Sequence, residues 1–207
     1  MRIWYAAYGS NLDRDRFQRY LTGGAAAGAL RSHTGARDTA APTGDRPVSL
    51  PGRLHFGWRS STWGGGVAFY VPGEGESQGV VRARAYLLTE GQFADVAAQE
   101  MHRETGGGLD LARVLAHGYD VAGPGRYETI HRVGTIGDRA VLTFTAEDPD
   151  ALGELAPTAP YLRTMAAGLR QSHGLDDEAV VDYLRESPVV RGAWSAGELW
   201  ECLAAPI

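Results

Sequence analysis

The amino-terminal segment changes from apolar to polar within a few positions. Residues 2–8 are dense in aromatic and other apolar side chains, and residues 9–11 read Gly-Ser-Asn, a turn-forming cluster. This pattern predicts a buried strand that runs into a tight turn. A helix is predicted over 13–21, capped by Ser10 or Asn11 and ended by the glycines that follow. Its apolar residues fall at helical spacing: Phe17, Tyr20 and Leu21.

The middle of the chain predicts short strands after a long loop. Residues 25–46 are rich in Ala, Gly, Thr and Pro without a lasting period, which predicts a surface loop without regular structure. Strand-like runs then recur at 53–59, 66–71, 80–88, 127–133 and 140–145. Predicted turns separate them at 63–66, 72–75 and 134–138.

The last third of the sequence has helical spacing instead. Its apolar residues form two runs with a helical period: Tyr161, Met165 and Leu169, then Val180, Tyr183 and Leu184. They predict two helices joined at His173-Gly174, and a short amphipathic helix follows around Cys202. No repeat or linker stands out, so we expect one domain over 1–207. Strands gathered before helices predict an α+β, barrel-like fold rather than a βαβ array.

One further helix places a carboxylate on its apolar face. A capping-box pattern begins at Thr89, and the apolar stripe that follows includes Phe93 and Val96. Glu100 comes seven residues after Phe93 and four after Val96, so it lies on the same inward face. A buried carboxylate must raise its pKa, find donors or line a cavity, and each outcome suits a general acid/base. The alternative, which periodicity leaves open, is a solvated Glu100 that pairs with Arg103.

The turn after the first strand is a second candidate for chemistry. In the string Tyr8-Gly9-Ser10-Asn11-Leu12, Gly9 lets a ligand approach the backbone closely. Amides at the start of a helix also point donors at an anionic or oxyanionic group. The alternative is an ordinary helix cap, and the residues by themselves leave both interpretations open.

Composition and charge exclude several functional classes. The 207 residues carry a net charge of −5, so we expect no nucleic-acid partner. All 20 residues counted as Lys+Arg are arginine, which excludes Schiff-base chemistry, pyridoxal phosphate attachment and a P-loop lysine. No apolar run has the length of a membrane span, and the first residues do not resemble a secretory leader. We therefore expect no membrane partner and a cytoplasmic location.

Metal and nucleophile chemistry also find no support in the sequence. The six histidines show no HxH or HExxH spacing, and the single cysteine cannot complete a zinc site or an internal disulfide. No Gly-x-Ser-x-Gly elbow occurs. We therefore expect neither a bound metal nor a Ser-His-Asp hydrolase.

The loop and the glutamate together resemble a known family. The string from Tyr8 to Leu12, directly after the first strand, resembles the signature loop of the gamma-glutamylcyclotransferase superfamily, which includes the AIG2-like proteins and the cyclotransferase of butirosin biosynthesis. In that family a catalytic glutamate follows a strand tyrosine at a fixed interval, and Tyr86 and Glu100 have this separation. The family has glycine after the glutamate, where this chain has Met101.

The similarity extends from residue 2 to residue 184 in order. The segment 157–175 is similar to the family's Pro-Ser-x-x-Tyr helix start, its helical glycine and its later Gly-Leu, here with Tyr161 as the aromatic residue and Gly168 in the helix. Residues 25–46 interrupt the similarity and look like an insertion.

The resemblance implies a fold, a site and a reaction. The fold is a small mixed β-barrel with flanking helices. The reaction is an intramolecular acyl transfer that releases 5-oxoproline and a free amine from a small γ-glutamyl compound, without a cofactor. Glu100 is the implied general acid/base, and the implied substrate-binding residues are Tyr8, Gly9, Ser10, Asn11, Leu12 and Tyr161.

Two other functions stay open. One is a non-catalytic module on the same fold that binds a small metabolite. The other is a pathway-specific enzyme that removes a γ-glutamyl protecting group, with residues 25–46 shaping its specificity. The sequence does not indicate an oligomeric state.

Overall fold

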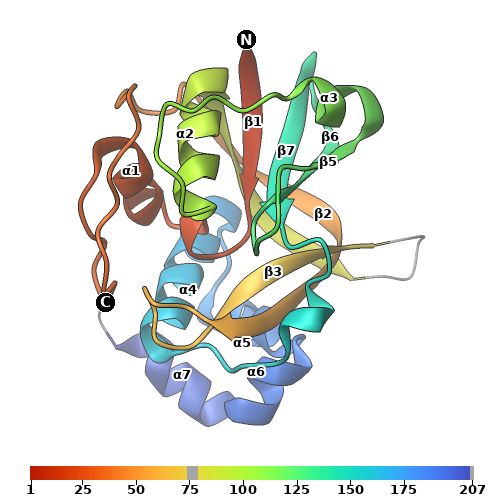
Figure 1. The fold of residues 1–207 in the computed structure, drawn as a ribbon. Helices are drawn as coiled ribbons and strands as arrows, with labels where there is room; N and C mark the ends of the chain where they lie inside the picture. Colours follow the sequence, from red (N-terminus) through yellow and green to blue (C-terminus); the bar gives the residue numbers. More distant parts are fainter. Residues whose placement is uncertain (74–78, 206–207) are drawn as a thin grey trace.

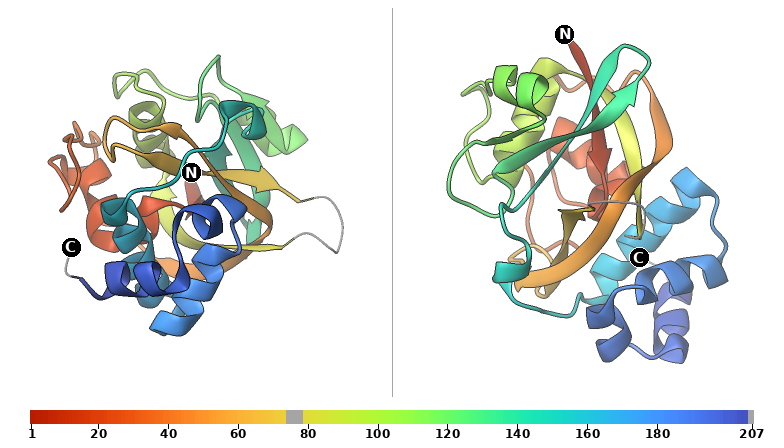
Figure 2. Two further views of the ribbon diagram at one scale, coloured as in Figure 1. Left: turned by 90° about the horizontal axis from the view of Figure 1, so that it is seen from below. Right: turned by 90° about the vertical axis from the view of Figure 1, so that its right-hand side faces the viewer.

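The fold is built on a mixed β-sheet that curls into a half-barrel (Figures 1 and 2). The computed structural model describes residues 1–73 and 79–205, and within them seven strands follow the order β3-β2-β4-β1-β7-β6-β5. The central pair β1 and β7 is parallel, and the other pairs are antiparallel. The strands are β1 Arg2–Ala7, β2 Asp45–Arg59, β3 Gly66–Pro72, β4 Val80–Thr89, β5 Tyr119–Val121, β6 Thr129–Ile136 and β7 Arg139–Thr145.

Strand β1 is buried on both faces, as its apolar sequence predicts. Ile3 and Tyr5 pack into one hydrophobic cluster with α1 and α2, whereas Trp4 and Ala6 pack into a second cluster with the carboxy-terminal helices. Successive side chains of a strand point to opposite faces, so a strand with a core on each side is apolar at every position. The central strand therefore fixes the position of the turn that follows it.

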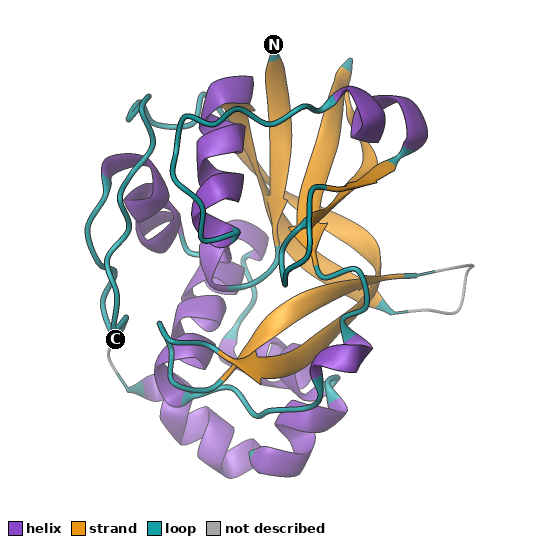
Figure 3. Ribbon diagram, viewed as in Figure 1, coloured by secondary structure: helices purple, strands orange, loops and turns teal. Residues whose placement is uncertain are grey.

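Most helices cover the sheet in two groups, and α3 lies apart from both, against β5 and β6 (Figure 3). Helix α2 (Glu90–Glu100) runs beside β1, α1 (Arg14–Thr22) lies next to α2, and the four carboxy-terminal helices gather at the far end of the sheet. The remaining elements are η1 Ser10–Leu12, α3 Ala112–His117, η2 Asp150–Leu152, α4 Ala159–His173, α5 Asp177–Arg185, α6 Pro188–Ala193 and α7 Ala196–Ala204. Among the described residues no helix is long and apolar enough to cross a bilayer.

Strand β2 is much longer than the predicted strand at 53–59. Residues 45–51 pair with β4 and residues 52–59 pair with β3, with Gly52 at φ 137° between the two halves. In the sheet as described, each half thus has one edge without a ladder partner, and proline is tolerated at such an edge because its missing N–H is not needed. Pro47 and Pro51 therefore do not end the strand.

Several other boundaries also differ from the prediction. Asp13 rather than Ser10 or Asn11 caps α1, since its Oδ1 accepts from the Arg16 amide at 2.7 Å. The turn between β6 and β7 shrinks to residues 137–138, because β6 continues past a bulge. Elements β5, α3 and α6 were not predicted. Part of the predicted turn at 72–75 lies outside the described residues.

The segment 25–46 is loop over most of its length, as predicted, and it is tied to the body of the protein. Arg37 donates from its amide to Asp95 Oδ2 at 2.9 Å, and its guanidinium forms an ion pair with the same carboxylate. An isolated bridge joins Gly24 and His33. These contacts place the segment beside α2, at the edge of the cavity described next.

Candidate active site

The turn after β1 forms a short 3-10 helix, η1, whose first amides have no acceptor within the turn. Gly9 precedes it, and the Leu12 amide donates to the Gly9 carbonyl at 3.0 Å. The amides at the start of such a turn, those of Ser10 and Asn11, have no acceptor within it. This geometry offers closely spaced donors to a carboxylate or an oxyanion.

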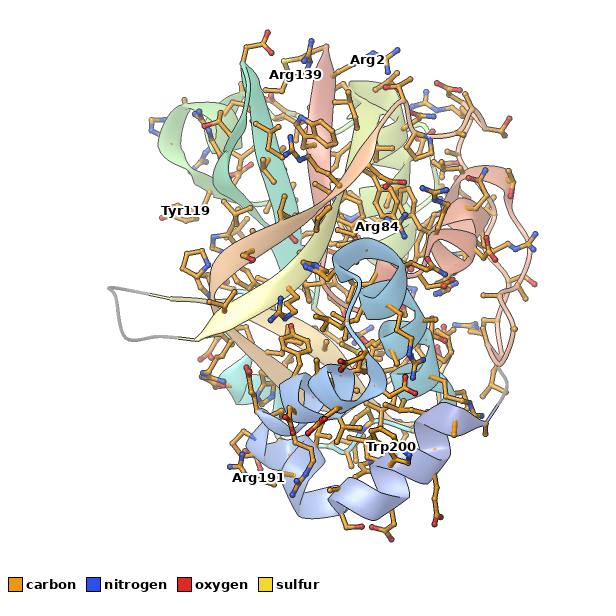
Figure 4. The ribbon with its side chains drawn as sticks, turned by 180° about the vertical axis from the view of Figure 1, so that it is seen from behind. Arg2, Arg84, Tyr119, Arg139, Arg191 and Trp200 are labelled. Atoms are coloured by element: carbon orange, nitrogen blue, oxygen red, sulfur yellow. The ribbon has the colours of Figure 1, made fainter. Side chains whose placement is uncertain are left out.

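Two side chains of strand β4 hold this turn in place, and Figure 4 labels one of them, Arg84. The guanidinium of Arg84, buried in β4, donates to the Leu12 carbonyl at 3.2 Å. The Tyr86 hydroxyl donates to the Asn11 carbonyl at 2.9 Å. Both carbonyls are thus satisfied from the sheet side, whereas Gly9, Ser10 and Asn11 line the cavity described below.

Helix α4 packs directly against the same turn at Gly168. A β-carbon at this position would lie 2.3 Å from the Leu12 carbonyl carbon and 2.4 Å from the Asp13 amide nitrogen. Only glycine allows the two backbones to approach this closely. The helical glycine therefore sets the distance between α4 and the turn.

Helix α2 brings Glu100 to the cavity side of the turn. The predicted capping box at Thr89 is present, and Phe93 and Val96 are fully buried. Asn11 Nδ2 donates to Glu100 Oε1 at 3.0 Å, and the Tyr20 hydroxyl interacts with the same carboxyl. The alternative partner Arg103 pairs with Glu128 instead. The inward interpretation of Glu100 is therefore the one that the geometry supports.

The surroundings of Glu100 disfavour its charged form. Burial raises the pKa of the Glu100 carboxyl above its ordinary value, whereas the hydrogen bonds from Tyr20 and Asn11 and the charge of Arg16 oppose that rise. The carboxyl is half-buried at the cavity wall. A carboxylate whose pKa is raised by burial is suited both to accept and to return a proton.

One cavity of about 450 Å³ joins these groups. It is lined by Tyr8, Gly9, Ser10, Asn11, Glu100 and Tyr161, which are six of the seven residues proposed from the sequence. Leu12 does not line it, because its side chain is fully buried in the core beneath the turn. The Tyr161 hydroxyl accepts from the Ala68 amide at 2.9 Å and lies close to Gly9.

Several residues of the cavity wall were not predicted from the sequence. Arg16 and Tyr20 lie one turn apart on α1 and both face the cavity, with the Arg16 guanidinium 5.0 Å from the Tyr20 ring centroid. Their i, i+4 spacing after the loop was the available signal. Tyr5 also lines the cavity, and Asn11 Nδ2 donates to its hydroxyl at 3.4 Å.

His33 comes from the segment 25–46, and no periodic signal marks it. It contacts the guanidinium of Arg16. Burial, with the Arg16 charge, lowers the pKa of His33 to about 3, so the ring is neutral at pH 7. The segment 25–46 thus supplies a neutral polar group to the cavity wall.

Met101, which stands where the resembling family has glycine, needs no glycine backbone. Its φ is −79°, and the left-handed residue that ends the helix is His102, at φ 56°. A side chain at 101 is therefore compatible with this helix end.

Within residues 1–73 and 79–205, no three His, Cys, Asp or Glu side chains gather as a cluster that could bind a metal ion.

Comparisons with known proteins bear on the fold. No family model matches the sequence. Histone deacetylase 5 of Arabidopsis thaliana is 38% identical over 100 residues, which amount to 47% of this chain and 15% of that protein. The chain thus matches a small part of that much longer relative.

Two solved structures share the architecture. A gamma-glutamyl cyclotransferase superposes with a TM-score of 0.52 and 16% identity, covering 88% of this chain and 86% of its own. An uncharacterized protein from Homo sapiens gives a TM-score of 0.51 and 17% identity with the same coverage. The chain therefore has the gamma-glutamyl cyclotransferase-like α+β fold, which confirms the predicted fold class.

Proposed function

We propose that this protein is a gamma-glutamyl cyclotransferase-type enzyme, which converts a γ-glutamyl compound into 5-oxoproline and a free amine. The observation that carries the proposal is the hydrogen bond between Asn11 and Glu100 at the wall of the cavity. Among the described residues, Glu100 is the one carboxylate that lines this cavity, and the bond joins it to the turn after β1. The likeness to a gamma-glutamyl cyclotransferase structure supports the assignment at the level of the fold.

The turn is suited to hold the glutamyl part of the substrate. The amides of Ser10 and Asn11 would donate to a substrate carboxylate or to the carbonyl oxygen under attack. The side-chain oxygen of Asn11 is buried and accepts no hydrogen bond from the described residues. The Nδ2 group of the same side chain holds Glu100 in the cavity wall, where that carboxyl would reach a substrate α-ammonium.

Glu100 is the proposed carrier of protons. Its carboxylate takes a proton from the α-ammonium, and the resulting amine attacks the γ-amide carbonyl carbon. A new C–N bond closes the five-membered ring, and the old amide C–N bond breaks. The two protons that the attacking nitrogen loses both reach the leaving nitrogen, which departs as an ammonium group. The reaction needs no nucleophile from the protein and no cofactor.

The proposal is tested by replacing Glu100 with glutamine and measuring 5-oxoproline by mass spectrometry over a panel of γ-glutamyl compounds. We expect Glu100→Gln to lower kcat by at least about 10²- to 10⁴-fold, the usual contribution of a general acid/base. Glu90→Gln is the matched control, because Glu90 lies at the opposite end of the same helix.

Three results would overturn the proposal or part of it. Near-normal 5-oxoproline release by a folded Glu100→Gln protein excludes Glu100 as the acid/base. An equal loss in Glu90→Gln means that the effect is structural. No release from any compound by the parent protein excludes the enzyme and favours a binding module on the same fold.

A further inference from the structure

A second hollow of about 840 Å³ opens directly outside the cavity of Glu100. The two share several wall residues, among them Trp58, His33 and His102. We call this second hollow the vestibule. Four arginines line it, namely Arg31, Arg59, Arg103 and Arg126. None of its lining residues within the described chain is Asp or Glu.

The arginines of the vestibule come from separate parts of the chain. Arg31 belongs to the segment 25–46, Arg59 ends β2, and Arg126 lies in the loop before β6. The Arg31 guanidinium donates to Ser61 Oγ at 3.1 Å, and that of Arg59 donates to the Gly64 carbonyl at 2.6 Å. Their positions at the vestibule are thus fixed by neutral partners.

The charge of the vestibule is not compensated by the protein. Arg103 pairs with Glu128, but Arg31, Arg59 and Arg126 form no ion pair with any carboxylate in the described part of the chain. This is notable in a protein with a net charge of −5. Like charges around one hollow repel one another unless an anion enters it.

Backbone strain marks the same place. Two non-glycine residues among those described have a positive φ, Trp58 at 46° and His102 at 56°, and both line the vestibule. Such conformations cost free energy and cluster at ligand sites. The Trp58 ring in turn supports Arg126, whose guanidinium carbon lies 3.5 Å from the ring centroid. Stacking on an aromatic ring orients a guanidinium for recognition of a planar or tetrahedral anion.

We propose that the vestibule binds a dianionic group on the amine part of the substrate, either a phosphate monoester or a pair of carboxylates. This inference rests on the proposed function, because it assigns the glutamyl part to the inner cavity and the leaving amine to the vestibule. Three uncompensated arginines carry more positive charge than the single negative charge of one carboxylate balances. A dianion balances more of this charge, and its several oxygens can accept from arginines that reach the vestibule from three segments.

The test compares matched substrates that differ in the charge of the amine part. They are γ-glutamyl ethanolamine, which is neutral there, γ-glutamylglycine, γ-glutamyl aspartate and the phosphate ester of γ-glutamyl ethanolamine. We expect kcat/KM for the best dianionic compound to exceed that for the neutral one by about 10- to 100-fold, the sum of two or three partly exposed ion pairs. The ratio should fall toward one in about 1 M salt.

Variants locate the preference in the vestibule. Arg31→Gln, Arg59→Gln and Arg126→Gln should each lower the ratio of dianionic to neutral kcat/KM by about two- to fivefold. Arg46→Gln is the matched control, because Arg46 is exposed on β2 and lines neither hollow. A ratio near one in the parent protein, or an equal change in Arg46→Gln, overturns the inference while the 5-oxoproline release itself upholds the proposed function.

A direct binding measurement separates the two proposals. O-phosphoethanolamine and L-aspartate, the amine products, are titrated into the full chain by calorimetry, with ethanolamine for comparison. We expect one of the two dianions to bind and the Arg126→Gln variant to weaken that binding by about two- to fivefold. The better ligand distinguishes a phosphate from a dicarboxylate. If no compound releases 5-oxoproline, the proposed function fails, and if neither dianion binds better than ethanolamine, the vestibule inference fails.

Discussion

The side-chain amide of Asn11 donates to Oε1 of Glu100 at 3.0 Å, although the two residues lie 89 positions apart in the chain. One belongs to the turn after β1 and the other to the last position of α2. This hydrogen bond fixes the end of α2 against the turn. Its acceptor is the carboxyl that the proposed reaction uses. Changes at Asn11 should therefore act on the chemistry of Glu100.

We predict that Asn11→Ala shifts the acid limb of the kcat/KM profile to higher pH. A hydrogen bond donated to the carboxylate stabilises its charged form, so its loss raises the pKa of Glu100 further. Activity near neutral pH should fall by about 10- to 100-fold, which corresponds to one hydrogen bond to a charged group. The measurement is kcat/KM over pH 4 to 9.

The Asn11→Asp variant should have its acid limb at the highest pH of the three proteins, above Asn11→Ala and the parent. A second carboxylate at this distance disfavours ionisation of Glu100, so the acid limb should move beyond that of Asn11→Ala. The turn itself should stay in place, because Tyr86 holds the backbone carbonyl at position 11 and not its side chain. An acid limb at the same pH in all three proteins would contradict the assignment of that limb to Glu100.

Local signals in the sequence predicted the framework of the site. The capping box at Thr89 fixes where α2 begins, and the spacing from Phe93 then determines the face on which Glu100 lies. The apolar run before Gly9 likewise predicts β1. These are short-range effects, in which one residue constrains its neighbours in the chain.

The remaining features depend on contacts between distant segments. Nothing near Pro47 shows that its half of β2 pairs on one side only, and nothing near His33 shows that it contacts Arg16. The bond between Asn11 and Glu100 likewise exists because the sheet brings the two segments together. Tertiary packing decides such contacts, and the periodicity of a single sequence does not predict them.

Gly168→Ala should destabilise the protein and Gly197→Ala should not. A β-carbon at 168 would overlap the backbone of Leu12 and Asp13, so α4 must move away from the turn, at a cost of about 1–3 kcal/mol or more. Gly197 lies in α7 with no atom within 4 Å of the added carbon. There alanine should be neutral or stabilise by up to about 1 kcal/mol. Urea unfolding measures both, and equal effects would refute the close contact at 168.

Gly9 and Tyr161 should be energetically coupled. A β-carbon at position 9 would lie 2.8 Å from the Tyr161 hydroxyl, whereas the nearest ring carbon is 3.9 Å away. Gly9→Ala should therefore be destabilising alone and better tolerated with Tyr161→Phe, with a coupling of about 0.5–3 kcal/mol in a double-mutant cycle. Tyr161→Phe alone leaves the buried Ala68 amide without its acceptor, which costs about 1–3 kcal/mol.

The control for this cycle pairs Gly9→Ala with Tyr119→Phe. Tyr119 is exposed on β5, as Figure 4 shows, and its hydroxyl forms no hydrogen bond with the described residues. The two changes should add within about 0.5 kcal/mol. Additive behaviour in the Tyr161 cycle as well would contradict the predicted overlap.

Glu100→Gln should increase the thermal stability of the protein, and the gain should grow with pH. Burial raises the pKa of Glu100 in the folded protein above its unfolded value, so the folded state holds this proton more tightly. Stability contributed by such a group is present below the unfolded pKa, near 4.5, and is lost as the pH rises through the folded pKa. Glutamine does not titrate and avoids this loss. The difference in Tm between variant and parent should therefore be more positive at about pH 8 than at about pH 4. A gain in stability on loss of a catalytic carboxylate is expected, because active sites often trade stability for chemistry. A difference that is constant with pH, or larger in acid, would show that the carboxylate is not disfavoured in the folded protein.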